Sequence, residues 1–205
     1  MNASAASQTV SVYARRPRQT AAMSLRTPMP RLDQPPVLLR AFEPADSVLV
    51  VMAASDPLIP LISSVPPAPD PNLARAFINR QHARLTDGDG YSFAIADSTS
   101  GEAVGQIGLW LAGMRDGRAS VGYWVIAAHR GRGLAGHALT ALSRWGLARP
   151  DIHRLELYVE PWNVASWRAA ERAGYEREGL LRSWQQVGDQ RRDMFMYSLL
   201  PPGSR

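Results

Sequence analysis

A glycine- and arginine-rich stretch between a predicted strand and a predicted helix is the part of this sequence best suited to chemistry. The segment HRGRGLAGHALTALSRWGLAR, residues 129–149, directly follows the strand-like run VGYWVIAA. The first turn of a helix leaves backbone N–H groups unpaired and partly positive, so it can bind an anion. Gly131 and Gly133 let a ligand approach the backbone, and Arg130 and Arg132 add positive charge. The stretch predicts a site for the pyrophosphate of a nucleotide or coenzyme.

Two nucleotide-binding patterns can be compared with this turn. A Walker-type P-loop needs a lysine after its last glycine, and the chain contains no lysine. Gly131, Gly133 and Gly136 match the dinucleotide fingerprint G-x-G-x-x-G, and Glu156 lies near the offset of a ribose-binding acid. In dinucleotide folds, however, the motif opens a parallel sheet, whereas the segments before it here carry the turn residues of antiparallel hairpins. A dinucleotide-dependent oxidoreductase is therefore the weaker interpretation.

A further pattern, R/Q-x-x-G-x-G/A, fits the same turn. Its positions are Arg130, Gly131, Arg132, Gly133, Leu134 and Ala135. With this pattern the chain resembles the GNAT superfamily of acetyl-CoA-dependent N-acetyltransferases. A second segment, 159–184, is similar to the signature N-x-x-S…G-[FY]-x-x-E-G-x-x-R of the Rim-type branch, which acetylates ribosomal-protein N-termini and related amines. Its matching residues are Asn163, Ser166, Gly174, Tyr175, Glu178, Gly179 and Arg182. The resemblance spans roughly residues 37–200.

The resemblance implies where the coenzyme binds. In the family, the strand before the glycine turn splays from the next strand, and the pantetheine arm of acetyl-CoA adds to its exposed backbone. Trp124, Val125 and Ile126 would line that arm, and one of their backbone N–H groups would polarise the thioester carbonyl. Asn163 would contact pantetheine, in addition to the N-cap role that asparagine favours before a helix.

The resemblance also implies catalytic residues, with departures from the family pattern. Ser166 is the candidate to protonate the leaving thiolate, because Ala170 stands where many members have a tyrosine acid. Relatives often have glutamate at the positions of Ser120 and His137, so His137 acting through water is a weak candidate for the general base. The remaining candidates are Glu102, Glu156 and Glu160. These departures keep open an alternative function, an acyl-CoA-binding module for sensing or assembly without efficient turnover.

Composition bounds the remaining possibilities. With 205 residues, 45% of them hydrophobic, the chain suits one globular domain. The absence of cysteine excludes disulfides and a cysteine nucleophile, and the four histidines lack metal-ligand spacing, so we expect no metal. Of the net charge of +5, residues 1–33 carry +4 (five arginines, one aspartate), which argues against a nucleic-acid partner. No membrane span or secretory signal is evident. We therefore expect a cytoplasmic monomer or homodimer whose acceptor is a primary amine of a small molecule or a protein N-terminus.

Periodicity and turn residues divide the chain into elements. We predict a flexible basic leader over 1–35 and an N-acetyltransferase domain over 36–205, with the proline-rich segment 57–71 as a loop. The predicted strands are 38–42, 92–97, 103–111, 118–126, 154–160, 177–187 and 191–199. The predicted helices are 46–54, 72–85, 133–148 and 164–173.

These elements and the resemblance together indicate the fold. We expect an α/β (α+β) single domain of the GNAT type, with a mixed, mostly antiparallel sheet of about seven strands. About four helices would flank it, and the strands would splay at the coenzyme site. Within this fold we expect Tyr175 to lie in the core, and Glu178 to pair with Arg182 beside a substrate loop.

Overall fold

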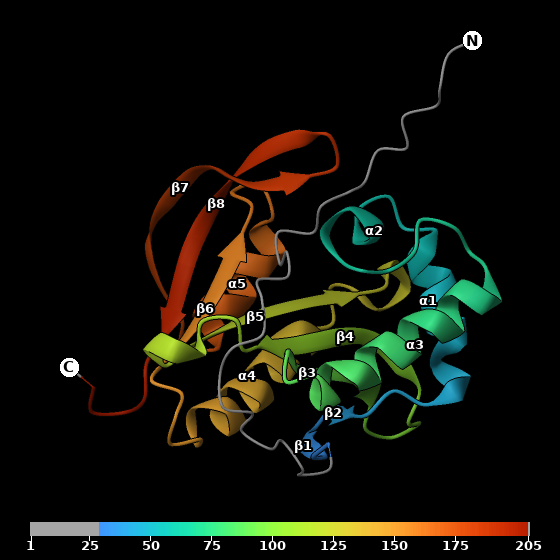
Figure 1. Ribbon diagram of the computed structural model, residues 1–205, viewed down its shortest axis with the longest axis horizontal. Coiled ribbons are helices and arrows are strands. Elements are labelled where there is room, and N and C mark those ends of the chain that lie inside the picture. The colour runs from blue at the N-terminus through green and yellow to red at the C-terminus, as the bar shows by residue number, and fades with distance from the viewer. Residues whose placement is uncertain (1–28, 205) are drawn as a thin grey trace.

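One mixed sheet organises the molecule. The computed structural model describes residues 29–204 (Figure 1). The sheet has the strand order β1-β2-β3-β4-β5-β6-β8-β7, and β5–β6 is the one parallel pair among the described strands. The strands are β1 Leu32–Gln34, β2 Val37–Arg40, β3 Gly90–Asp97, β4 Ala103–Trp110, β5 Arg118–Val125, β6 Arg154–Val159, β7 Glu176–Val187 and β8 Gln190–Leu199. The predicted fold class is confirmed, with eight strands in place of about seven.

Five α-helices lie in the described part of the chain, one more than expected. They are α1 Ser47–Ala54, α2 Ile59–Ile62, α3 Pro71–Thr86, α4 Leu134–Leu147 and α5 Val164–Arg172. α3 begins one residue before the predicted start, because the Asp70 carboxylate accepts hydrogen bonds from two N–H groups of the first turn and proline is favoured at the first helical position. None of the helices in residues 29–204 is long and apolar enough to cross a membrane.

The two faces of the sheet carry separate cores. Along β5, Val121 and Val125 contribute to the larger core, which includes residues of α4 and α5. Trp124, and Ile126 just beyond the end of β5, belong to the smaller core together with residues of α1 and α3. This division follows from the alternation of side chains along a strand. α1 and α3 therefore cover one face, and α4 and α5 cover the other (Figure 1).

Two short elements differ from the sequence prediction. β1 pairs antiparallel with β2 and lies inside the stretch 1–35 assigned to the leader; residues 1–28 of that stretch lie outside the described residues. The prediction of a loop over 57–71 is wrong at α2. There the Asp56 carboxylate accepts hydrogen bonds from the N–H groups of Leu58 and Ile59, at 2.9 and 3.1 Å. Pro60 falls in the first turn, where a helix needs no N–H donor.

The two parallel strands separate near the middle of the sheet. Their pairing runs from Arg118 opposite Arg154 to Val121 opposite Leu157 and ends there. β5 nevertheless continues to Val125 and β6 continues to Val159. Beyond this point the two strands no longer pair with each other, and the gap between them is called the splay. The splay was the feature expected at the coenzyme site.

Candidate active site

The glycine turn between β5 and α4 is open above its backbone. Gly131 and Gly133 both have φ of +75°, in the left-handed region that favours glycine. A Cβ built on either residue meets no atom within 4 Å. The N–H groups of Leu134 and Ala135 lie in the first turn of α4, where a helix offers them no acceptor, and no side chain caps this end of the helix. The turn can therefore receive an anion directly on its backbone.

The two arginines of the turn differ in their surroundings. Arg132 is exposed, with Nη1 3.1 Å from Nδ1 of His129. Arg130 instead donates from Nε to the Val125 carbonyl at 2.9 Å and from Nη2 to Asp56 at 2.6 Å. Arg130 therefore ties the turn to Asp56, and its charge is matched by a carboxylate. This differs from the sequence expectation of two arginines beside the phosphate.

Asp56 joins the glycine turn to α2. Its side chain is only 6% exposed. Burial alone would raise the pKa of Asp56, but the N–H groups of Leu58 and Ile59 and the Arg130 guanidinium outweigh burial and lower that pKa. The carboxylate is therefore held in its charged form while it both accepts from the N–H groups of Leu58 and Ile59 and pairs with Arg130.

Of the three residues expected to line pantetheine, one directs its backbone into the splay. The N–H of Ile126 bonds to the Val104 carbonyl, on the side of β4. The Val125 carbonyl accepts from Arg130, and the N–H and C=O of one strand residue point to the same side. The N–H of Val125 therefore faces the splay. The side chain of Trp124 is buried and donates to Gln106 Oε1 at 2.7 Å.

The start of α5 lies across the splay from β5. Asn163 is the N-cap, and its side chain accepts from the N–H of Ser166 at 3.2 Å. Ser166 is half-buried, and its hydroxyl lies 2.8 Å from the hydroxyl of Tyr123 on β5. The structure therefore brings Asn163 and Ser166 together as expected and adds Tyr123 to them.

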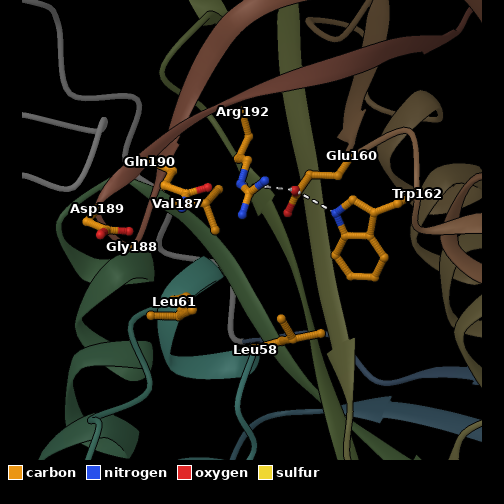
Figure 2. A pocket seen from close by; sticks show the side chains of 9 residues that line it. All are labelled: Leu58, Leu61, Glu160, Trp162, Val187, Gly188, Asp189, Gln190 and Arg192. Carbon is orange, nitrogen blue, oxygen red and sulfur yellow. Dashed lines mark hydrogen bonds and ion pairs between the residues drawn. The ribbon is translucent and has the colours of Figure 1, made fainter.

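A cavity of about 570 Å³ lies between α2 and the β7–β8 hairpin. Figure 2 shows Leu58 and Leu61 on one side of it and hairpin residues, including Arg192, on the other. Glu160, directly after β6, lies beside Arg192 in this view and is about 10% exposed. Its Oε2 accepts from Trp162 Nε1 at 2.7 Å and lies 3.8 Å from Arg192 Nε. The cavity therefore combines an aliphatic floor with a held carboxylate.

The other candidate bases lie elsewhere. His137 is exposed in the first turn of α4 and is not among the described residues that line the cavity. Glu156 is buried and paired with Arg154 at 2.9 Å, and Glu102 is exposed. Glu160 is therefore the one candidate base that lines the cavity. Residues 29–204 contain no group of three or more histidine, aspartate or glutamate side chains placed to hold a metal ion.

The second family segment has a structural part. Tyr175 is buried, as expected, and its hydroxyl lies 2.8 Å from that of Ser143. The predicted pair of Glu178 with Arg182 is wrong, because Glu178 accepts two hydrogen bonds from Arg154, at 2.8 and 2.6 Å. The reason is that Glu178 lies on the outer strand β7 beside β8, within reach of β6, a neighbour that sequence spacing does not reveal.

Sequence reasoning missed two residues of this region. Asp56 had a local signal, because an aspartate followed by proline and a short aliphatic run is a typical helix start. Tyr123 had only its strand position, which placed it with Val121 and Val125 on the core face. Its contact with Ser166 spans 43 positions and has no local signature.

Comparisons with known proteins identify relatives of this chain in both sequence and fold. The family model described as "Acetyltransferase (GNAT) domain" matches residues 37–176. The uncharacterized N-acetyltransferase p20 of Bacillus licheniformis is 29% identical over 162 residues, covering 79% of this chain and 91% of that protein. RimJ of Mycobacterium smegmatis, solved with CoA-disulfide, has a TM-score of 0.67 and 22% identity over 83% of this chain and 86% of its own. RimL, a ribosomal alpha-N-protein acetyltransferase solved with coenzyme A, has a TM-score of 0.68 and 18% identity over 83% and 98%. The chain belongs to the GNAT acetyltransferase family.

Proposed function

We propose that this protein transfers an acetyl group from acetyl-CoA to a primary amine. The observation that carries the proposal is the position of two open sites at the same splay. The glycine turn follows β5, and the cavity carboxylate Glu160 follows β6. Acetyl-CoA lying in the splay would therefore have its phosphates at the glycine turn and its thioester near an amine bound in the cavity.

The coenzyme side of the reaction follows from the exposed backbone. The pyrophosphate would lie on Gly131, Gly133 and the first turn of α4, where a Cβ would otherwise stand. Arg132 would add charge, and Arg130 would hold the turn in place through Asp56. Pantetheine would lie along the part of β5 that pairs with β4 but no longer with β6. The N–H of Val125 would donate to the thioester carbonyl and stabilise the negative charge that develops on its oxygen.

The bond changes then involve two side chains. The neutral amine attacks the carbonyl carbon, a C–N bond forms, and the C–S bond breaks with its electron pair moving to sulfur. The Ser166 hydroxyl donates a hydrogen bond to that sulfur as its charge develops. The proton lost by the nitrogen passes to the carboxylate of Glu160, which Trp162 and Arg192 hold at the cavity wall.

The cavity supports an amine with an apolar neighbour. Leu58 and Leu61 would contact an aliphatic side chain, while Glu160 would face the neutral amine nitrogen and accept its proton. A volume of about 570 Å³ lies within the range of small-ligand sites and can hold one terminal residue. We therefore propose a protein N-terminus as the acceptor, the class named for RimL, and a cytoplasmic location.

Release of coenzyme A thiol tests the proposal directly. The chain has no cysteine, so a thiol reagent reports only the released coenzyme. The assay compares short peptides that differ in the first residue with the same peptides blocked at the N-terminus and with free polyamines. We expect release with unblocked peptides that begin with a small or aliphatic residue. Mass spectrometry of the peptide would locate the acetyl group on the α-nitrogen.

Other outcomes separate the competing functions. Thermal stabilisation by acetyl-CoA without thiol release from any amine would favour the acyl-CoA-binding module. Stabilisation by nicotinamide dinucleotides alone would favour the oxidoreductase. Glu160→Gln should lower kcat about 10²-fold at neutral pH because the amine proton loses its acceptor. Glu102→Gln is the matched control on an exposed turn, and its kcat should equal that of the parent.

A further inference from the structure

Tyr123 stands at the point where the sheet opens. It lies two residues beyond Val121, the last β5 residue paired with β6, and its side chain faces the α4–α5 side. Its hydroxyl lies 2.8 Å from Ser166 Oγ and 3.1 Å from the Ser166 carbonyl oxygen. Tyr123 therefore bridges β5 and α5 across the splay and contacts one residue there through two atoms.

Hydrogen-bond accounting limits what this contact can be. A phenol has a single proton to donate, and both nearby acceptors belong to Ser166. The carbonyl of Ser166 also lies within α5, where the N–H four residues later is its regular donor. If Tyr123 donates to Ser166 Oγ, the serine proton is free to point elsewhere. If it donates to the carbonyl, the serine proton points back at Tyr123. The choice of acceptor by Tyr123 therefore decides whether the serine proton points back at the phenol or is available to another group.

A charge that develops beside Ser166 selects between these arrangements. An anion next to Ser166 attracts the serine proton, so Tyr123 must then donate to Ser166 Oγ. Burial raises the pKa of Tyr123 to about 12, although its hydrogen bond with Ser166 opposes that rise. The phenol is therefore protonated and able to donate throughout the neutral pH range.

A second tyrosine–serine pair in the chain shows the contrast. The hydroxyls of Tyr175 and Ser143 are also 2.8 Å apart, but both residues are buried in the core. Ser166 is half-buried at the start of its helix, so one side of its oxygen remains accessible. Unlike the core pair, the Tyr123–Ser166 pair can therefore act on a group outside the core.

We propose that Tyr123 is a positioning residue that donates a hydrogen bond to Ser166 Oγ and so aims the serine hydroxyl at the coenzyme sulfur. The inference rests on the proposed function, in which Ser166 stabilises the leaving thiolate. No proton leaves Tyr123 in this step. As negative charge develops on sulfur, the two hydrogen bonds strengthen together, because each donor in such a chain polarises the next.

A double-mutant cycle tests this inference. Four proteins are compared for kcat and for acetyl-CoA affinity: the parent, Tyr123→Phe, Ser166→Ala and the double variant. We expect Ser166→Ala to lower kcat about 10²-fold and Tyr123→Phe to lower it about 10-fold, with acetyl-CoA affinity nearly unchanged. In the S166A background, Tyr123→Phe should change kcat less than about twofold, because it acts through the missing hydroxyl.

Tyr175→Phe is the matched control, since it removes the hydroxyl of the tyrosine–serine pair that is buried in the core. It should lower the melting temperature about as much as Tyr123→Phe does and leave kcat at the parent value. An equal loss of kcat in Tyr175→Phe would overturn the inference by assigning the effect to packing. So would a parental kcat in Tyr123→Phe, or the same 10-fold loss with and without the Ser166 hydroxyl.

Failure of the proposed function gives different results. A parental kcat in Ser166→Ala would remove the role of Ser166 and with it that of Tyr123. Absence of thiol release from the parent with every amine would overturn both proposals. An active parent with a defective S166A variant and a normal Y123F variant would overturn only the positioning role.

Discussion

Replacing Gly133 by alanine separates the cost of backbone strain from the loss of a ligand site. Gly133 has φ of +75°, and a Cβ at this position meets no protein atom within 4 Å. The only cost to the unliganded fold is therefore the left-handed conformation, about 1–2 kcal/mol for alanine. Against a total stability of about 5–15 kcal/mol, the variant should stay folded. A chain of this size should then melt about 2–8 °C below the parent.

The loss of affinity for acetyl-CoA should be larger than backbone strain alone would cause. The new methyl group would occupy the space in which the pyrophosphate approaches the backbone. We expect the dissociation constant for acetyl-CoA, measured by isothermal titration calorimetry, to rise at least about tenfold, which corresponds to about 1.4 kcal/mol. The matched control is Gly88→Ala, because Gly88 has φ of +76° and an equally open surrounding in the turn after α3. Parental affinity in a folded G133A variant, or the same loss of affinity in G88A, would refute the phosphate site.

Two further predictions concern stability. The hydrogen bonds from Arg154, together with Ser198, lower the pKa of Glu178 from 4.5 to about 2. A carboxyl with a lowered folded pKa stabilises the fold above its unfolded pKa and loses that contribution as pH falls toward the folded value. Between about pH 4.5 and 2, the melting temperature of Glu178→Gln should therefore fall less than that of the parent. An equal fall in melting temperature in both proteins would contradict this reasoning. Gln106→Leu should lower the free energy of unfolding by about 1–3 kcal/mol in urea titrations, because the buried Trp124 N–H loses its acceptor; an unchanged midpoint would contradict that accounting.

The elements that sequence reasoning placed well are those with local signals. The start of α3 follows from Asp70 and Pro71, and the hairpins follow from turn residues between alternating strands. The glycine turn was recognisable because a strand, two glycines and an amphipathic helix adjoin one another in the chain. The backbone conformation that the turn needs is encoded within a few residues.

The side-chain partnerships of the site are not local, and spacing did not reveal them. Arg130 pairs with Asp56 across 74 positions, and Tyr123 reaches Ser166 across 43. Each contact depends on how strands and helices are ordered in space. Sequence analysis excluded a tyrosine acid at Ala170 on α5, and the structure brings a phenol to the same helix from β5. Side-chain alternation along β5 assigns Tyr123 to the face that carries Val121 and Val125, but alternation cannot identify its partner.

The single aspartate between α1 and α2 has a consequence for protein engineering. Asp56 accepts hydrogen bonds from the N–H groups at the start of α2, beside the cavity residues Leu58 and Leu61, and the same carboxylate holds Arg130 in the glycine turn. The segment 56–62 is therefore not an exchangeable module. A chimera that imports this segment from another acetyltransferase must also carry an acidic residue at position 56, or Arg130 will lose its carboxylate partner. Libraries that vary the floor while keeping Asp56 avoid this linkage.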